Sequence, residues 1–157
     1  MARVVLWPAP VMAGPHGTGG EPAANGAGEA AHILVVDDDE ELCELLAMRA
    51  RANGYRVTAT PGIAPTLELL EREHVDVILL DLDLGVDHGF DVLDAVVARS
   101  PHIPIIVLTA SGTVDTQAEA SRRGARGFVT KPYHHRDLLQ RIAGAVGDAR
   151  ARAARAG

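Results

Sequence analysis

The feature that most constrains the fold of this chain is an alternation of short aliphatic runs with helix-length amphipathic segments. The runs are rich in β-branched and aliphatic residues and cover 33–36, 56–58, 75–80, 103–108 and 127–129. The helix-length segments cover 40–52, 63–73, 90–98, 113–122 and 137–146. Five β–α units in about 115 residues predict an α/β fold with a parallel sheet and helices on both of its faces. Such a fold gathers its chemistry at the carboxyl ends of the strands.

The spacing of apolar residues predicts which side of each helix faces the core. The expected inward stripe of segment 40–52 consists of Leu42, Leu45, Leu46 and Met48. Cys43 lies on the same apolar side and is expected to be buried as a small hydrophobic residue. Segment 113–122 has the weakest stripe, because only one valine and several alanines face inward. Asn53-Gly54 and Gly124 stand where helices are expected to end.

The 157 residues have room for one ordinary domain between two segments of different composition. Residues 1–31 differ from the rest, and the stretch 13–31 is mostly Gly, Ala, Pro and Glu without apolar periodicity, so we expect a flexible tail. Residues 32–147 carry the β–α units and form the expected domain. Residues 148–157 are rich in Ala and Arg, which predicts a C-terminal helical extension or tail.

Composition narrows the possible functions. The net charge of −6 argues against a nucleic-acid partner, which requires a basic face. The single cysteine excludes a disulfide framework and a multi-cysteine zinc site. No apolar run approaches the roughly 18 residues of a membrane span. We therefore expect a cytoplasmic domain that uses neither DNA nor a membrane as its partner.

Polar side chains follow four of the five predicted strands. Asp37, Asp38 and Asp39 follow the first, Asp81 the third, Thr109 the fourth, and Lys131-Pro132 the fifth. Since the carboxyl ends of parallel strands meet at one edge of the sheet, these groups are expected to share a cleft. Clustered carboxylates repel one another unless one takes up a proton or a cation joins them. Oxygen ligands of this kind suit Mg²⁺, and a lysine ammonium suits phosphate. Asp81 is then a candidate nucleophile able to form an aspartyl phosphate.

Each of these residues also has a purely structural interpretation. Asp38 and Glu41 have the spacing of a helix capping box. Asp81 alone is compatible with an ordinary strand end, Thr109 with a hydroxyl bonded to the backbone, and Lys131-Pro132 with a turn. The functional interpretation depends on their joint placement.

Four segments of the chain resemble the response-regulator receiver domain, the two-component signalling module typified by the chemotaxis response regulator. They are 33–40 (ILVVDDDE), 77–82 (VILLDL), 105–110 (IIVLTA) and 124–132 (GARGFVTKP). They resemble, in order, the opening strand with its acidic pair, the phosphoacceptor strand, the switch-threonine strand and the last strand with its Lys-Pro. The resemblance extends over about residues 32–146.

The resemblance implies a flavodoxin-like fold with five parallel strands in the order 2-1-3-4-5. It implies that Asp81 accepts the phosphoryl group, and that Mg²⁺ (or Mn²⁺) is held by Asp38, Asp81 and the backbone carbonyl of Asp83, with Asp37 acting largely through water. The resemblance further implies that Thr109 and Lys131 contact the phosphoryl group and that Phe128 is the switch aromatic. It also implies a cis peptide bond before Pro132.

The resemblance also implies the partners. The phosphoryl donor is a histidine kinase or a histidine phosphotransfer protein, and a downstream protein is expected to contact the 113–122 helix and the last helix. Because only about ten residues follow the last predicted helix, we expect a stand-alone receiver that signals through protein contact. The resemblance implies a signalling phosphoacceptor, capable at most of self-phosphorylation and self-dephosphorylation, and not an enzyme. Two alternatives remain: a receiver-like adaptor that is never phosphorylated, and a Mg²⁺-dependent aspartyl-phosphate phosphatase suggested by Asp81-Leu82-Asp83.

The loop after Asp81 departs from the family. Gly85 stands where a proline is usual, and His88 stands where an aspartate is frequent, with Asp87 just before it. Either Asp87 or His88 is a candidate cap for the helix that begins near Phe90. Asp83 adds a carboxylate beside the site, which could assist metal binding or repel an attacking water.

Overall fold

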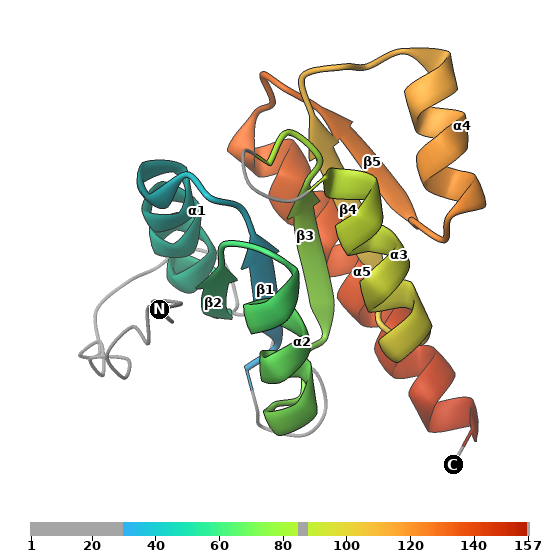
Figure 1. Cartoon of the computed structure of the whole chain (residues 1–157). Helices are drawn as coiled ribbons and strands as arrows, with labels where there is room; N and C mark the ends of the chain where they lie inside the picture. Colours follow the sequence, from blue (N-terminus) through green and yellow to red (C-terminus); the bar gives the residue numbers. More distant parts are fainter. Residues whose placement is uncertain (1–29, 85–87, 157) are drawn as a thin grey trace.

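Five parallel strands form one sheet in the order β2-β1-β3-β4-β5. The computed structural model describes residues 30–84 and 88–156. Its strands are β1 (His32–Val36), β2 (Arg56–Thr60), β3 (Val77–Asp81), β4 (Ile105–Thr109) and β5 (Gly127–Thr130). All four pairings are parallel. The strand order reverses between β1 and β3, which places the switch point of the sheet next to Asp81 (Figure 1).

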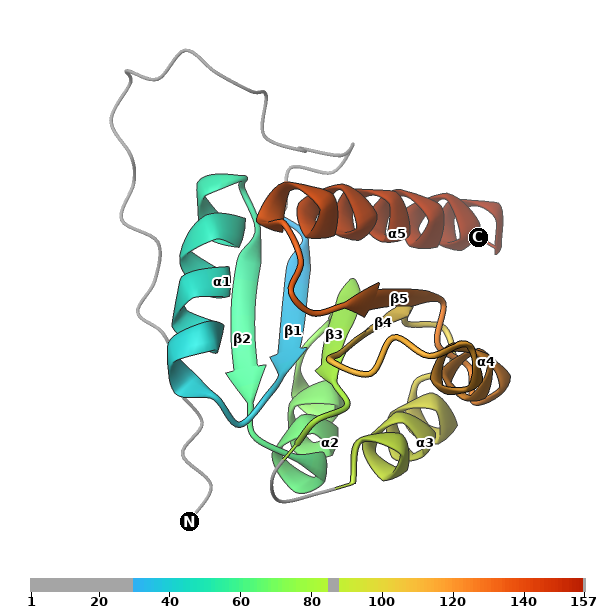
Figure 2. The same cartoon turned by 90° about the horizontal axis from the view of Figure 1, so that it is seen from above.

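Four helices connect the strands, a fifth follows β5, and together they cover both faces of the sheet. They are α1 (Glu40–Ala52), α2 (Ile63–Arg72), α3 (Gly89–Arg99), α4 (Val114–Arg122) and α5 (His135–Ala156). Figure 2 shows α1 and α5 on one face and α2 and α3 on the other, with α4 beside the β5 edge. The predicted α/β class, strand order and two-sided arrangement are therefore confirmed.

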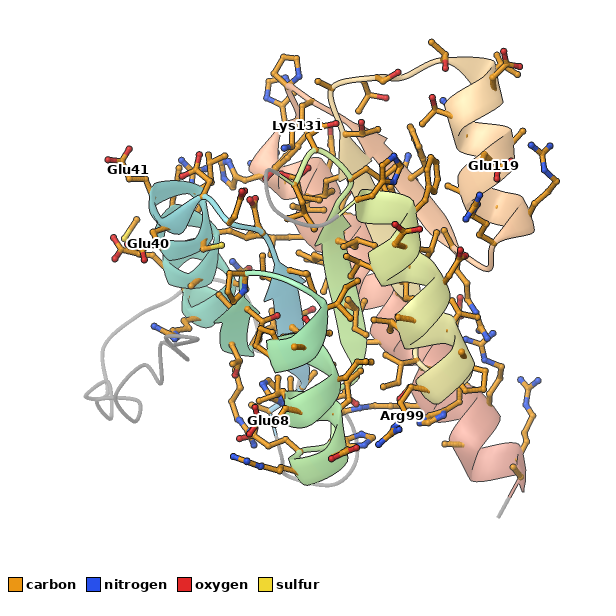
Figure 3. The ribbon with its side chains drawn as sticks, viewed as in Figure 1. Glu40, Glu41, Glu68, Arg99, Glu119 and Lys131 are labelled. Carbon is orange, nitrogen blue, oxygen red and sulfur yellow. The ribbon has the colours of Figure 1, made fainter. Side chains whose placement is uncertain are left out.

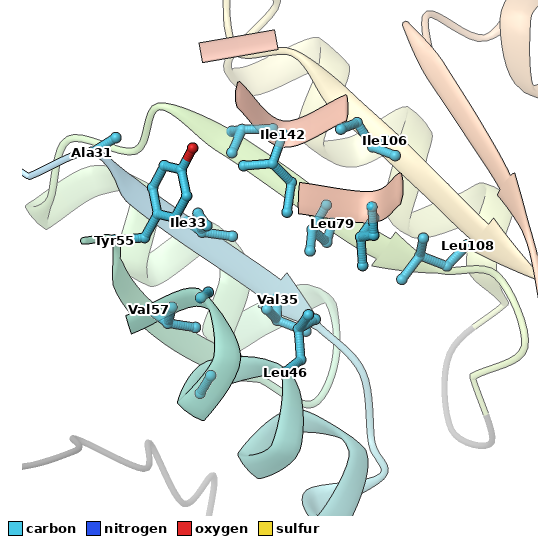
Figure 4. Close-up of a cluster of buried hydrophobic side chains, with 14 of the residues drawn as sticks. Ala31, Ile33, Val35, Leu46, Tyr55, Val57, Leu79, Ile106, Leu108 and Ile142 are labelled. Atoms are coloured by element: carbon cyan, nitrogen blue, oxygen red, sulfur yellow. The ribbon is translucent and has the colours of Figure 1, made fainter. Parts of the chain in front are cut away.

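Two hydrophobic cores lie on opposite faces of the sheet. Ile33 and Leu79 point to the α1–α5 side, where Figure 4 shows them with Leu46, Tyr55 and Ile142. Alternate residues of the same strands point to the other side, against α2 and α3. Strands β1, β3 and β4 are buried over their whole length, as strands covered on both faces should be.

Helix α1 buries a different stripe from the one that we expected. The residues that pack against the sheet are Cys43, Leu46, Ala47 and Ala50, at helical spacings of three and four. Of the expected stripe, Leu46 is buried, while Leu42, Leu45 and Met48 are 45%, 43% and 62% exposed. The prediction was wrong because three small side chains, together with Leu46, form the inward face. The other larger aliphatic residues point outward.

Capping residues and glycines end the helices as expected, except at the start of α1. Asp39 caps α1, because its side chain accepts a hydrogen bond from the Leu42 amide at 3.2 Å. The capping box considered for Asp38 and Glu41 is therefore wrong. Asn53 is the C-cap of α1, and Gly54 follows it with a φ of 88°. Gly124 ends α4 in the same left-handed region, with a φ of 105°.

A polar network at the amino end of the sheet fastens the far part of α5. The buried Asp76 carboxylate accepts a hydrogen bond from the His32 amide at 2.7 Å, and the Arg150 guanidinium lies 3.5 Å from it. Burial alone would raise the pKa of Asp76, but these donors outweigh burial and lower it. Helix α5 thus continues through residues that we assigned to a C-terminal extension.

Ala31, which we assigned to the N-terminal tail, is 2% exposed and packs in the core. Residues 1–29 lie outside the described part of the chain.

Within residues 30–84 and 88–156, no helix is long and apolar enough to cross a membrane.

Candidate functional site

An ion pair between Asp81 and Lys131 lies at the centre of the site. Asp81 ends β3 and is 4% exposed, while Lys131 follows β5. The Lys131 Nζ lies 2.7 Å from Asp81 Oδ2, and the Asp83 amide donates to Asp81 Oδ1 at 2.8 Å. Figure 3 shows Lys131 at the end of the molecule where the strands terminate. Each carboxylate oxygen of Asp81 therefore accepts at least one hydrogen bond in a nearly buried position.

Asp37 is the second carboxylate of the site. Burial and the neighbouring negative charge of Asp81 raise its pKa to about 6, against the opposing hydrogen bond from the Asp39 amide. The Cys43 thiol donates to the Asp37 backbone carbonyl at 3.6 Å and helps to hold this loop. Burial, followed by the surrounding acidic charges, raises the pKa of Cys43 to about 12, so its thiol stays protonated and unreactive.

Lys131 is the cation that balances these charges. Burial alone would lower its pKa, but the hydrogen bond and charge of Asp81 outweigh burial and raise it. Lys131 therefore remains an ammonium. The peptide bond between Lys131 and Pro132 is cis.

Thr109 and the start of the following loop form a set of hydrogen-bond donors directed at Asp83. The Thr109 hydroxyl donates to Asp83 Oδ1 at 3.1 Å, and the Ala110 amide donates to Asp83 Oδ2 at 2.8 Å. We placed Thr109 in this cleft from the sequence, but no sequence pattern pointed to Ala110 or to the contacts of the Asp83 side chain. These depend on how the loops after β3 and β4 fold toward each other.

The remaining acidic residue, Asp38, is exposed on the loop after β1. Across the described ranges, no group of three or more His, Cys, Asp or Glu side chains is arranged as a metal site. Mg²⁺ usually takes only one or two protein carboxylates and completes its shell with water and phosphate oxygens. Repulsion from Asp81 contributes to the raised pKa of Asp37, and a hard divalent cation between these carboxylates would relieve it. The oxygen donors present therefore fit Mg²⁺.

A cavity of about 420 Å³ opens from the Asp81–Lys131 pair toward α1. Its walls include Leu42 and Leu45 of α1 on one side and Pro132 and Tyr133 of the β5–α5 connection on the other. The outward aliphatic residues of α1 thus flank the entrance to the acidic site.

The face formed by α4 and β5 is loosely packed. Helix α4 buries only Ala120, and Val114 is 80% exposed. Phe128 on β5 is half-buried against the core on the α2–α3 side. Arg123 at the end of α4 pairs with Asp94 of α3 at 2.5 Å and lies 5.0 Å from the centre of the Phe90 ring. The weak packing expected of segment 113–122 is confirmed.

The loop after Asp81 is described only in part. Gly85 and Asp87, two of the departures noted above, lie outside the described residues. His88 is the N-cap residue of α3, and its side chain makes no capping hydrogen bond. Its ring instead stacks on Phe90, with centroids 6.1 Å apart.

Comparison with known families and curated proteins gives a consistent result. The family model of the response regulator receiver domain matches residues 33–143. The transcriptional regulatory protein GlrR of Escherichia coli is 36% identical over 112 residues, which cover 71% of this chain and 25% of that protein. The probable transcriptional regulatory protein TcrX of Mycobacterium tuberculosis is 30% identical over 115 residues, 73% of this chain and 49% of that protein. The matched segment thus spans about a quarter to a half of these relatives, so they do not support our expectation of a stand-alone regulator.

Solved structures show the same fold. The signal receiver domain of a putative Luxo repressor protein from Vibrio parahaemolyticus is 26% identical, with a TM-score of 0.76 over 82% of this chain and 98% of that one. A CheY-like receiver domain protein from Methanospirillum hungatei JF-1, 23% identical, has a TM-score of 0.74 over 79% and 99% of the two chains. Sequence, topology and structural likeness agree: this chain belongs to the response regulator receiver domain family of two-component signalling.

Proposed function

We propose that Asp81 accepts a phosphoryl group from a histidine kinase or a histidine phosphotransfer protein. The observation that carries this proposal is the pair formed by the buried Asp81 carboxylate and the Lys131 ammonium, 2.7 Å apart at the carboxyl end of the sheet. Receiver domains are signalling phosphoacceptors and generally not enzymes. The proposed role for this chain is a switch whose two states are set by the phosphoryl group on one side chain.

The reaction needs one carboxylate oxygen and a way to neutralise charge. An oxygen of Asp81 forms a bond to phosphorus while the bond between phosphorus and the donor imidazole nitrogen breaks, and the electron pair stays on the imidazole. Phosphoryl transfer depends mainly on positioning and on stabilising the phosphoryl oxygens. Lys131 supplies a fixed positive charge beside Asp81, and Thr109 supplies a hydroxyl donor. Both roles are assigned from their place in the site.

We assign Mg²⁺, or Mn²⁺, to Asp38, Asp81 and the backbone carbonyl of Asp83, with Asp37 acting through water. When bound, the cation neutralises charge on the phosphoryl oxygens and on the acidic residues. Asp37, whose pKa burial and the charge of Asp81 raise to about 6, would compete at low pH by holding a proton in place of the charge that attracts the cation.

The raised pKa of Asp37 predicts that stabilisation by Mg²⁺ depends on pH. Between about 3.8 and 6 the folded chain holds a proton on Asp37 that the unfolded chain has released, so the metal-free domain loses stability as the pH rises through this window. Mg²⁺ should therefore raise the melting temperature more at about pH 7.5 than at about pH 5, because at low pH it must displace the proton. Thermal melts with and without Mg²⁺ measure both values.

The Asp37→Asn variant is the control for this effect. It should show a smaller difference between the two pH values, because position 37 no longer titrates. A Mg²⁺-induced shift that is equal at both pH values in the wild type would contradict the assignment.

The outward face of α1 suits the phosphodonor. Leu42, Leu45 and Met48 are exposed on α1, and the first two line the cavity that leads to Asp81. Exposed apolar groups next to a site are typical of protein contacts. For the output we propose the face of α4, β5 and α5, with Thr109 moving toward the phosphoryl group and Phe128 turning inward. Loosely packed elements such as α4 are the ones that move most easily.

We propose that this phosphoryl exchange takes place in the cytoplasm, where response regulators typically act. We also propose that the receiver domain itself does not bind DNA.

The experiment that tests the proposal uses acetyl phosphate and Mg²⁺ as the phosphodonor system. The chain should gain the mass of one phosphoryl group, and Asp81→Asn should gain none. Chelation of divalent metal should abolish the gain. Intact mass spectrometry measures all three samples.

The alternatives have distinct outcomes in the same assay. No mass gain in the wild type would indicate a receiver-like adaptor and would overturn the phosphoacceptor role. Sustained turnover of small phosphomonoesters would indicate a phosphatase, whereas stoichiometric labelling supports the switch.

A further inference from the structure

The carboxylate of Asp83 occupies two hydrogen-bond donors at the edge of the site. Its Oδ1 accepts from the Thr109 hydroxyl at 3.1 Å and its Oδ2 accepts from the Ala110 amide at 2.8 Å. The Thr109 hydroxyl oxygen itself accepts from the Ser111 amide at 3.1 Å. This second bond leaves the Thr109 hydroxyl proton available for Asp83. One oxygen of an anion is thus bound by a side-chain donor and the other by a backbone donor.

The position of this carboxylate matters because Asp83 is hydrogen-bonded directly to Asp81. The Asp83 amide donates to Asp81 Oδ1, so the two residues are joined by a 2.8 Å hydrogen bond. The negative charge of Asp83 also acts on Lys131, where it helps to raise the pKa of the ammonium. Under the proposed function a phosphoryl group on Asp81 uses the Thr109 hydroxyl, and Asp83 now occupies that donor together with the adjacent Ala110 amide.

We infer that the Asp83 side chain is an internal competitor that fills part of the phosphoryl pocket in the unphosphorylated state. This inference rests on the proposed function of Asp81 and adds a regulatory residue to it. For phosphorylation to occur, the Asp83 carboxylate leaves Thr109 and Ala110 and turns toward solvent, to which the residue is already exposed. Two charge-assisted hydrogen bonds are exchanged in this step, so it slows phosphorylation and keeps Thr109 bound in the resting chain.

The Asp83→Ala variant tests the side chain alone, because it removes the carboxylate and leaves the backbone of the same residue in place. Alanine retains the amide that bonds Asp81 and the carbonyl that we assign to the metal. Loss of two charge-assisted hydrogen bonds should accelerate labelling of Asp81 by acetyl phosphate by roughly tenfold or more. Asp83→Asn, which keeps one carbonyl acceptor and has nearly the same shape, should give an intermediate rate and provides a second folded variant.

Two measurements distinguish competition for donors from simple charge repulsion. At about 1 M salt the screening length falls to about 3 Å, so an effect of charge alone should largely disappear. The effect of displacing a hydrogen-bonded carboxylate should persist. We therefore expect most of the difference in labelling rate between the wild type and Asp83→Ala to remain. In addition, the Ala110 amide proton should shift upfield in the NMR spectrum of unphosphorylated Asp83→Ala, because its acceptor has been removed. Glu41→Gln, an exposed neutralisation in the first turn of α1, should change neither quantity.

Each outcome has a defined meaning. Faster labelling of Asp83→Ala in high salt together with the Ala110 shift supports the inference. Equal non-zero rates in the wild type and both variants overturn it and leave the phosphoacceptor role of Asp81 intact. Slower labelling of Asp83→Ala also overturns it, because the carboxylate then assists the site. Absence of labelling in all of these proteins overturns the proposed function and the inference together.

Discussion

Replacement of Lys131 by alanine should slow transfer of a phosphoryl group to Asp81 by on the order of 100-fold, the typical effect of removing one preorganised group that stabilises developing charge. Lys131 is the only lysine of the chain, and its ammonium lies 2.7 Å from the acceptor carboxylate. Without it, the Asp81 carboxylate faces an incoming anion without the ammonium that is now bonded to it. The rate of labelling by acetyl phosphate, followed by intact mass, measures the effect.

Two further variants show whether the position of the charge matters. Lys131→Arg keeps the charge but replaces a compact ammonium by a larger planar group, so it should also be impaired. Arg136→Ala removes an exposed cation at the start of α5 and should label at the wild-type rate. An unchanged rate in Lys131→Ala would remove this residue from the proposed machinery.

The second large effect concerns stability and the orientation of α1. Leu46→Ala should lower the free energy of unfolding by about 2–4 kcal/mol, because it removes a buried side chain and leaves a cavity against the sheet. Met48→Ala, two residues further along the same helix, should change it by less than about 0.5 kcal/mol, because Met48 is 62% exposed. Urea denaturation of the two variants and the wild type gives both values. Similar losses in the two variants would contradict the packing of α1 described above.

The orientation of α1 shows where sequence patterns mislead. The buried positions 43, 46, 47 and 50 follow helical spacing closely, so the signal was present. The predicted stripe favoured leucine and methionine over alanine because larger side chains bury more apolar area, whereas the expected burial of Cys43 is confirmed. The sheet instead accepts the small residues, and Leu42 and Leu45 are left lining the cavity that leads to Asp81. A helix with more apolar residues than its inward face can hold has an ambiguous orientation from sequence alone.

The strands and the strand-end residues were more predictable, for a physical reason. A strand covered on both faces is apolar throughout, and parallel strands bring their carboxyl ends to one edge whatever the loops do. Asp81 and Lys131 therefore meet, although 50 residues separate them. The contacts of Asp83 with Thr109 and Ala110 were not predictable, because they depend on the shapes of two loops. The raised pKa of Asp37 beside Asp81 likewise depends on burial and on distance, which a sequence does not contain.

The most direct test of phosphorylation at Asp81 is to locate the phosphoryl group after labelling with acetyl phosphate and Mg²⁺. Borohydride reduces an aspartyl phosphate to homoserine, so the modified residue can be identified by peptide mass spectrometry. We expect homoserine at position 81 and at no other aspartate, and none in a sample treated with a chelator. Homoserine at Asp37, Asp38 or Asp83 in place of position 81, or its complete absence from a labelled wild-type chain, would contradict the assignment of Asp81 as the phosphoacceptor.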